Sequence, residues 1–193
     1  MKDIDATIIQ LLNNRSIFEE IHQIKTSFIS LFSDLANELS TLIMLEVHGS
    51  SQGIKITKGN ELQHCPYQVL DIIRDFDKEY GFNIRIMNWW GRGMFILVFL
   101  GKNNRRSVDF SNFSSNMKYL GFLLSSTSSP WDYKNMIDGG LMVAIESDLQ
   151  LKKHIEQFKY IQFIKKMEYS ENFDSLKLNL KEQVVQILKF YSE

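Results

Sequence analysis

The segment FNIRIMNWWGRGMFILVFLG, residues 82–101, constrains the fold of this chain more than any other stretch. Residues 82–90 and 94–101 have the composition of two β-strands, and the Gly91-Arg92 pair between them suits a two-residue type II′ turn. The strand at 94–100 is apolar on both of its faces, so we expect a layer of structure against each side. The segment therefore predicts a hairpin in the middle of a covered antiparallel sheet.

The predicted turn also assigns side chains to the two faces of the hairpin. It pairs Trp90 with Gly93 and Trp89 with Met94, and alternation then sends the two tryptophans to opposite faces. One predicted face carries Phe82, Ile84, Ile86, Trp90, Phe95, Leu97 and Phe99. The other carries Asn83, Arg85, Met87, Trp89, Met94, Ile96, Val98 and Leu100. Trp89 and Trp90 therefore cannot form one stacked aromatic clamp.

Helical patterns occur at both ends of the chain. Ser16 and Glu19 have the spacing of a capping box, which predicts the start of a helix over about 17–45, and a shorter helix precedes it. A heptad stripe follows the box: Ile17, Ile21, Ile24, Phe28, Leu31 and Leu35. Two further stripes predict C-terminal helices: Leu151, Ile155, Phe158, Ile161, and then Leu176, Leu180, Val184, Ile187, Tyr191.

The region between the helical ends is less regular. Pro66 and Gly81 occupy the positions at which a helix begins and ends. Between them an apolar face is formed by Val69, Ile73, Phe76 and Tyr80. We also predict short strands at 54–57, near 105–110 and at 141–145, whereas residues 111–148 as a whole carry little pattern.

These elements predict an α+β fold. We expect a small central antiparallel sheet with a hairpin at 82–101, packed by a long N-terminal helix and two C-terminal helices. A single domain over 1–193 would contain three parts: a helical N-terminal segment (1–47), a sheet-containing core (48–148) and the C-terminal helices (149–193).

The composition narrows the class of protein. With 22 basic and 23 acidic residues the net charge is −1, which argues against a protein whose main partner is nucleic acid. Cys65 is the one cysteine, so no intramolecular disulfide can form, and a reducing compartment suits the chain. No window approaches 18 uninterrupted apolar residues, and the first residues lack the basic start of a signal peptide. We expect a soluble, cytoplasmic protein without a membrane span.

The hairpin supplies the first candidate binding residues: Arg85, Trp89 and Arg92. An arginine within an otherwise apolar face needs a carboxylate or a ligand nearby, and buried tryptophan and arginine are typical of binding hot spots. Structural roles compete with this hypothesis, because an indole N–H can simply reach a loop carbonyl while its ring closes a hydrophobic layer. We expect the structural role for Trp90, and we favour Trp89 as the recognition residue.

A second candidate site lies in QHCPYQVLD, where His64, Cys65 and Asp71 come close in sequence. A thiol at a helix N-terminus has a lowered pKa, yet neighbours in an extended segment point to opposite sides, so His64 is poorly placed as its base. The chain contains no phosphate-binding loop, zinc motif or nucleophile elbow. We therefore assign no catalytic residue, metal ligand or cofactor, and a small molecule remains an alternative ligand.

The heptad stripe supplies the third candidate surface, represented by Ile21 and Phe28. It could bind a helix of another protein or of a second copy, or it could pack on the C-terminal helices of its own chain. The predicted helix is long enough for part of it to extend past the domain.

The missing catalytic constellation, the heptad helix and the aromatic hairpin tip together favour a non-enzymatic, cytoplasmic interaction protein. It would be an adaptor, an immunity- or inhibitor-like partner, or a subunit of an assembly, with a protein partner or self-association. The alternative is a small enzyme or ligand-binding domain with a pocket near Arg85, Trp89, His64 and Asp71. A polar cavity at Arg85 would favour the alternative, and a filled interior with an exposed apolar patch would favour the interaction protein.

Overall fold

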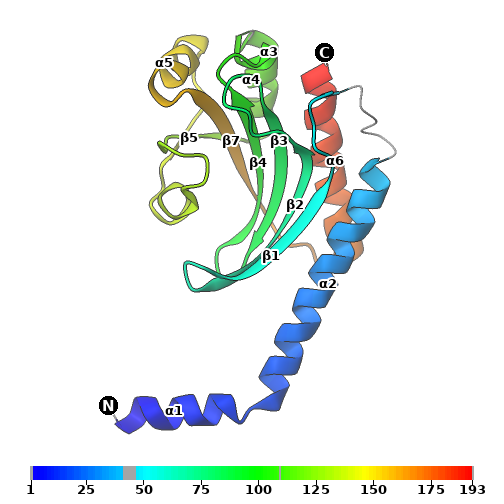
Figure 1. The fold of residues 1–193 in the computed structure, drawn as a ribbon, viewed down its shortest axis with the longest axis vertical. Coiled ribbons are helices and arrows are strands. Elements are labelled where there is room, and N and C mark those ends of the chain that lie inside the picture. Colours follow the sequence, from blue (N-terminus) through cyan, green and yellow to red (C-terminus); the bar gives the residue numbers. More distant parts are fainter. Residues whose placement is uncertain (1, 41–46, 109, 193) are drawn as a thin grey trace.

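The computed structural model describes residues 2–40, 47–108 and 110–192. They form a curved sheet with helices against one face, and at the N-terminal end a short helix and the beginning of a long one project away from this body (Figure 1). The structure is therefore α+β, with a long N-terminal helix and a C-terminal helix, as the sequence predicts.

The sheet has seven strands in the order β1-β2-β3-β4-β7-β5-β6, and each strand is antiparallel to its neighbours. The strands are β1 (Lys55–Leu62), β2 (Cys65–Arg74), β3 (Phe82–Trp89), β4 (Gly93–Gly101), β5 (Leu123–Ser125), β6 (Met142–Val143) and β7 (Tyr160–Met167). The predicted hairpin supplies β3 and β4, two inner strands of the run of long strands β1-β2-β3-β4-β7.

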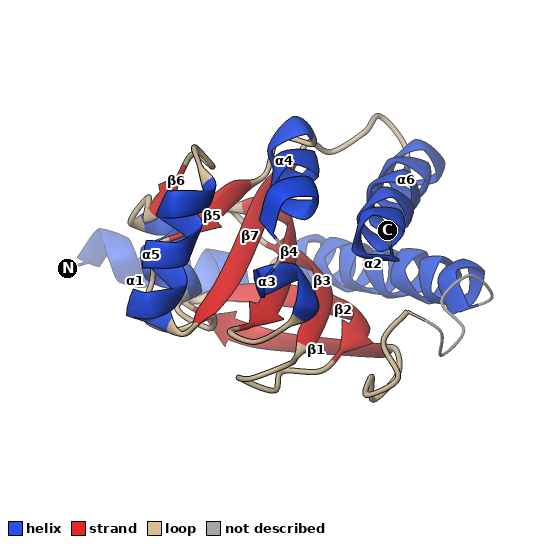
Figure 2. Ribbon diagram, turned by 90° about the horizontal axis from the view of Figure 1, so that it is seen from above, coloured by secondary structure: helices blue, strands red, loops and turns tan. Residues whose placement is uncertain are grey.

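The helices lie mainly at the two ends of the chain and after β4. They are α1 (Lys2–Leu12), α2 (Arg15–Ser40), α3 (Arg105–Val108), α4 (Phe110–Tyr119), α5 (Asp148–Phe158), α6 (Phe173–Ser192) and the five-residue π-helix η1 (Lys134–Asp138). Figure 2 shows α2, α4 and α6 on one side of the curved sheet. No helix in the described part of the chain is both long and apolar enough to cross a membrane.

Both faces of the central strands are covered. On the helical side, fully buried Phe32 and Leu35 of α2 and Leu180 of α6 belong to the main hydrophobic cluster. On the opposite side, a smaller cluster joins Trp89, Phe95 and Leu97 to Tyr133 and Met136. The segment from 126 to 140 therefore supplies the second layer that the doubly apolar strand requires.

The hairpin register differs from the predicted one by a single residue. Trp89 pairs with Gly93, so the loop has three residues, and Gly91 adopts a φ of +77° within it. A shift of one residue exchanges the faces of a whole strand. In consequence Phe82, Ile84 and Ile86 share their face with Met94, Ile96, Val98 and Leu100, whereas Arg85, Met87 and Trp89 share theirs with Phe95, Leu97 and Phe99.

The helix predicted between Pro66 and Gly81 is wrong, because residues 65–74 form strand β2. The apolar spacing of Val69, Ile73 and Phe76 fits a helix, but residues 68–73 are all buried in the structure. Such a short, mostly apolar segment, with β1 on one side and β3 on the other, fits a buried strand equally well.

Two further predictions near the sheet need correction. The strand expected near 105–110 is absent from the described residues there, which instead contain the short helix α3 and the first residue of α4. The second correction concerns β7, because the predicted helical stripe of α5 extends to Ile161, which is a strand residue in the structure. Lys159, with a φ of +64°, ends α5 in the left-handed region, and the chain then enters the sheet.

The cap of the long helix lies two residues before the predicted one. Asn14 Oδ1 accepts from the backbone N–H of Ile17 at 3.3 Å, so Asn14 caps α2, and Ser16 Oγ lies 3.1 Å from Glu20 instead of closing a box with Glu19. The helix is described as far as Ser40, and the predicted residues 41–45 lie outside the described residues.

Candidate functional site

Arg85 lies at the centre of the sheet face that is opposite to α2 and α6. Its guanidinium donates through Nε to Asp71 Oδ1 at 2.7 Å and through Nη2 to Asp71 Oδ2 at 2.9 Å. Asp71 is directly across from Arg85 in the β2–β3 register. The carboxylate that the sequence analysis required for this arginine is therefore a neighbouring strand residue.

The third donor group of this guanidinium fastens a loop to the sheet. Arg85 Nη1 donates to the hydroxyl of Tyr133, which is buried, and burial raises the pKa of Tyr133 so that the hydroxyl stays protonated. The rings of Trp131 and Phe76 have their centroids 4.9 Å and 5.3 Å from Arg85 Cζ. Only 13% of the Arg85 side chain is exposed. Its position is filled by protein groups, so it acts as a clamp for the 126–140 segment.

The two tryptophans at the hairpin tip are anchored on opposite faces. Trp89 is fully buried, and its Nε1 donates to the carbonyl of Leu62 at 2.9 Å. Trp90 is half-buried, and its Nε1 donates to Gln68 Oε1 at 3.0 Å. Both indoles thus make the structural contacts that compete with a role in recognition. A binding role of Trp89 would have to act through a neighbouring residue.

Arg92 is that neighbour. Its guanidinium lies over the Trp89 ring, 4.3 Å from the centroid, and donates to both oxygens of Asp138. A third contact joins Arg92 Nη1 to Cys65 Sγ at 3.1 Å. With 22% of its side chain exposed, Arg92 links the hairpin tip, the β1–β2 turn and η1.

Cys65 does not lie at a helix N-terminus, since it is the first residue of β2, so the helix-dipole argument for a reactive thiol is wrong. Gln63 and His64 form the preceding tight turn with φ values of +47° and +66°. His64 is exposed and Cys65 half-buried. In the described residues no group of three or more His, Cys, Asp or Glu side chains could hold a metal ion.

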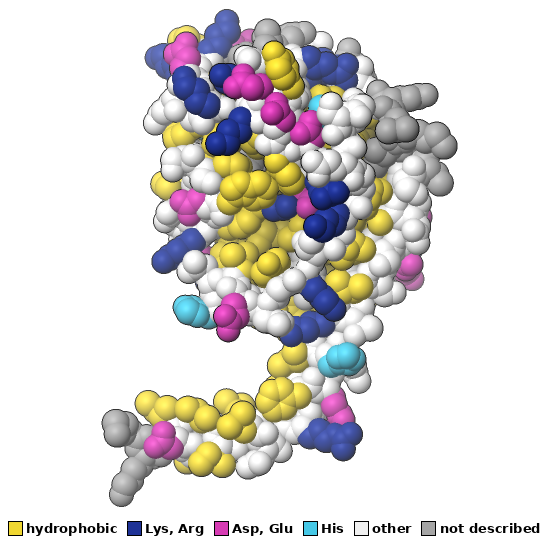
Figure 3. Space-filling view, viewed as in Figure 1, with side chains coloured by type: hydrophobic (Ala, Val, Ile, Leu, Met, Phe, Trp, Pro, Cys, Tyr) yellow, Lys and Arg dark blue, Asp and Glu magenta, His cyan; other side chains and the backbone are white. Residues whose placement is uncertain are grey.

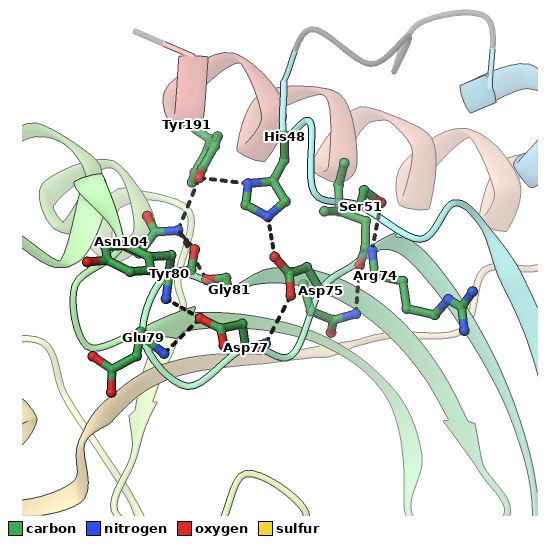
Figure 4. Close-up of polar contacts among 12 residues, drawn as sticks. His48, Ser51, Arg74, Asp75, Asp77, Glu79, Tyr80, Gly81, Asn104 and Tyr191 are labelled. Carbon is green, nitrogen blue, oxygen red and sulfur yellow. Dashed lines mark hydrogen bonds and ion pairs between the residues drawn. The ribbon is translucent and has the colours of Figure 1, made fainter.

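A polar network joins distant segments at the other end of the strands (Figure 4). His48 Nε2 lies 2.7 Å from Asp75 Oδ2, and Asn104 Nδ2 donates to the hydroxyl of Tyr191 at 3.1 Å. The Tyr191 ring stacks on Phe82 with centroids 3.7 Å apart. These contacts attach the end of α6 to the β2–β3 turn and to the loop after β4.

Three further cations follow β4 in the sequence, Lys102, Arg105 and Arg106, and each has a partner within the chain. Arg105 Nη2 and Arg106 Nε each donate to the backbone carbonyl of Tyr191 at 2.8 Å, where cations stabilise the negative end of a helix dipole. Lys102 Nζ lies 2.9 Å from Glu79 Oε1. These basic groups thus have structural roles.

The two candidate residues of the heptad stripe, Ile21 and Phe28, lie in different surroundings. Phe28 is buried, and its ring meets Phe173 at a centroid distance of 5.2 Å, whereas Ile21 is half-buried nearer the N-terminus. We call residues 2–24 the arm: it consists of α1 and the first ten residues of α2. Figure 3 shows it standing away from the body with hydrophobic side chains on its surface.

The arm carries a large share of the exposed apolar surface. Every side chain from Ile4 to Leu12 is exposed. Of the eighteen exposed large hydrophobic residues in the described part of the chain, seven lie in the arm: Ile4, Ile8, Ile9, Leu11, Leu12, Phe18 and Ile24. The arm is only about an eighth of the chain, so exposed apolar side chains are concentrated there.

Several residues of these sites were missed from the sequence, chiefly Trp131, Tyr133 and Asp138. All three lie in 111–148, where elements are short and no periodicity develops. The available signal was the aromatic pair in SSPWDY, since a tryptophan and a tyrosine in a loop need a surface to cover.

Comparisons of the chain with protein-family models, with curated proteins and with solved structures found no match.

Proposed function

We propose that this protein is a non-enzymatic, cytoplasmic interaction module, and that its arm binds the same arm of a second copy of the chain. The observation that supports this most directly is the uncovered apolar surface of α1. The unpaired, half-buried Cys65 suits the reducing compartment. The closed surroundings of Arg85 give no support to the alternative of an enzyme pocket at that residue.

In the described structure α1 has little packing from its own chain, because residues 4–12 are all exposed. α1 has eleven residues, and an isolated helix of that length is only marginally stable in water. Ile4, Ile8 and Leu11 follow i, i+4, i+7 spacing and make one apolar stripe, all of it exposed. A partner that covers this stripe would supply the packing that α1 lacks.

The exposed area is sufficient for a stable interface. A folded monomer of 22.6 kDa exposes about 9,500 Å². This chain exposes 10973 Å², an excess of about 1,500 Å² over that scaling. A typical specific interface buries about 800 Å² per partner, which is less than this excess.

The shape of the arm favours a second copy as the partner. The elbow between α1 and α2 forms an open, shallow hollow of about 690 Å³, which Leu12 and Phe18 line together with five polar or charged residues. Two bent arms related by a twofold axis would place the apolar stripe of each α1 against the elbow of the other. The result is a small four-helix bundle with an isologous interface, and twofold dimers are the commonest soluble oligomers.

The test is the molar mass of the full chain by light scattering over a range of concentrations. We expect about twice 22.6 kDa for the wild type. Leu11→Asp should give the monomer, because a charge cannot be buried in the apolar seam. Leu178→Asp is the matched control, since Leu178 is 55% exposed on α6 and Leu11 is 50% exposed on α1. A wild type that stays monomeric at high concentration, or a dimer that Leu11→Asp leaves intact, would overturn the proposal.

A further inference from the structure

A second concave site lies on the body, away from the arm. It is a cavity of about 610 Å³ where the β2–β3 turn, the loop after β5 and the junction of α5 with β7 meet. Its volume falls within the roughly 300–1,000 Å³ of small-molecule sites. Five aromatic residues contribute to its lining: Phe76, Phe99, Trp131, Phe158 and Tyr160.

The aromatic wall is a connected set of rings. The centroid of Phe76 lies 4.7 Å from that of Trp131 and 6.2 Å from that of Phe99. Phe99 in turn lies nearly parallel to Tyr160, with an interplanar angle of 28° and centroids 5.8 Å apart. Trp131 is 47% exposed, so a large aromatic face remains open at the cavity.

The rings are held in place by contacts outside the cavity. The Arg85 guanidinium lies beside Trp131 and Phe76 and is itself fixed by Asp71. The hydroxyl of Tyr160 donates to the carbonyl of Thr127 at 2.7 Å. A wall that is already ordered loses little conformational entropy when a ligand binds.

The rim of the cavity has a positive charge. Three lysines and one glutamate line it, and Lys102 is paired with Glu79 at 2.9 Å. Lys78 and Lys159 are exposed and form no ion pair with the described residues. Lys159 also holds a left-handed backbone conformation that normally favours glycine. Lys159 is therefore a strained residue at the edge of a concave site.

We propose that this cavity binds a flat aromatic small molecule that carries an acidic group. The ring of the ligand would lie against Trp131 and Phe99, as aromatic rings prefer offset or edge-on contacts at about 4.5–7 Å. Its carboxylate, sulfonate or phosphate would lie at the rim, within reach of Lys78 and Lys159. This site is separate from the arm, so the proposal of a ligand here does not depend on whether the chain forms a dimer.

The test uses 8-anilinonaphthalene-1-sulfonate as the anionic aromatic probe and N-phenyl-1-naphthylamine as its uncharged analogue. Titration of the full chain, followed by probe fluorescence, should show saturable binding of the anionic probe at one site in each chain. The uncharged analogue should bind more weakly, since it gains nothing from the rim lysines.

Three variants test whether the probe binds in the cavity or on the arm. Trp131→Ala should weaken binding by about tenfold through loss of the open ring face. The double variant Lys78→Gln/Lys159→Gln should weaken it by about threefold, because both lysines are exposed and screened by solvent. Leu11→Asp should leave probe affinity unchanged.

Thermal melting checks that each variant is folded, and the lysine variant keeps the test valid if Trp131→Ala is destabilised. Binding that survives both cavity variants but is lost with Leu11→Asp would place the probe on the arm and overturn the proposal. Equal affinity for the charged and uncharged probes, unaffected by the lysine changes, would also overturn it.

Discussion

At the scale of single residues, the ion pair of Arg85 and Asp71 decides how the sheet is closed on its second face. Asp71 is 3% exposed, and its carboxylate has a bidentate partner that also reaches the 126–140 segment. A buried charge whose partner is removed remains desolvated and uncompensated. The pair therefore holds Tyr133 and its loop in one position.

Arg85→Met should lower the free energy of unfolding by about 3–5 kcal/mol, because it leaves Asp71 buried without a cation. Urea denaturation measures this loss. The double variant Arg85→Met/Asp71→Asn should be more stable than the single variant, since no buried charge is left. A single variant within about 1 kcal/mol of wild type would show that the pair does not hold the loop.

His154 is also buried, but unlike Asp71 it has no ion-pair partner among the described residues. It is 6% exposed, its Nε2 has no hydrogen-bond partner among the described residues, and its ring meets Phe158 at 4.6 Å. Burial lowers the pKa of His154 to about 4. The folded state therefore holds the neutral imidazole, whereas the unfolded chain binds a proton below its ordinary pKa of about 6.5.

This difference predicts an acid-sensitive stability. The contribution of His154 is fully present above about pH 6.5 and is lost as the pH falls toward 4, on the order of 2 kcal/mol by pH 4.5. His154→Phe should flatten the difference in unfolding free energy between pH 7 and pH 4.5, measured by urea denaturation at each pH. If this difference is the same for the wild type and for His154→Phe, protonation of His154 does not destabilise the folded protein.

At the scale of elements, the junction of α5 and β7 shows how one residue changes a helix into a strand. Lys159 takes the left-handed conformation at the C-terminus of α5, and its N–H donates to Ile155 O at 2.9 Å. Tyr160 then starts β7, whose Ile161 would otherwise continue the helical stripe. A side chain other than glycine is strained in this conformation.

Lys159→Gly should therefore raise the free energy of unfolding by about 0.5 kcal/mol, because relief of strain exceeds the added entropy of the unfolded chain. The same change at Lys153, in the exposed middle of α5, should lower it by about 1 kcal/mol. Paired thermal melts measure both. If Lys159→Gly destabilises the protein as much as Lys153→Gly, the left-handed cap carries no strain.

At the scale of the whole molecule, the chain divides into a body with both sheet faces covered and an arm with little covered surface. The second half of α2 packs on β2 and α6, and Lys177 and Lys181 of α6 both pair with Glu38. The first half of the same helix leaves the body with α1. One heptad stripe thus serves the core at one end and an open surface at the other.

If the arms pair, amide hydrogen exchange in α1 should depend on protein concentration. The dimer protects the α1 amides, whereas in dilute solution an uncovered eleven-residue helix opens readily. Exchange in α6 should be the same at both concentrations, because its packing lies within one chain. Protection of α1 that does not change with dilution would mean that its stability comes from within the monomer.

The sequence by itself determined the elements whose periodicity is long. α2 and α6 repeat their apolar positions over three or more turns and α1 over about two, and Gly91 and Gly93 interrupt the apolar run 82–101. These signals are local, since each depends on residues within one helix or one hairpin. They were enough to predict the α+β class, the position of the hairpin and a long helix that extends beyond the body.

Only the tertiary structure decided the short and non-local features. Residues 68–73 satisfy both a helix and a buried strand, and pairing with β1 and β3 selects the strand. The hairpin register depends on one residue of loop, and that residue changes which side chains share Arg85's face. The partner Asp71, the covering loop with Tyr133 and the aromatic cavity follow from that pairing. No local pattern contains them, because the interacting groups lie far apart in sequence and meet only when the sheet is assembled.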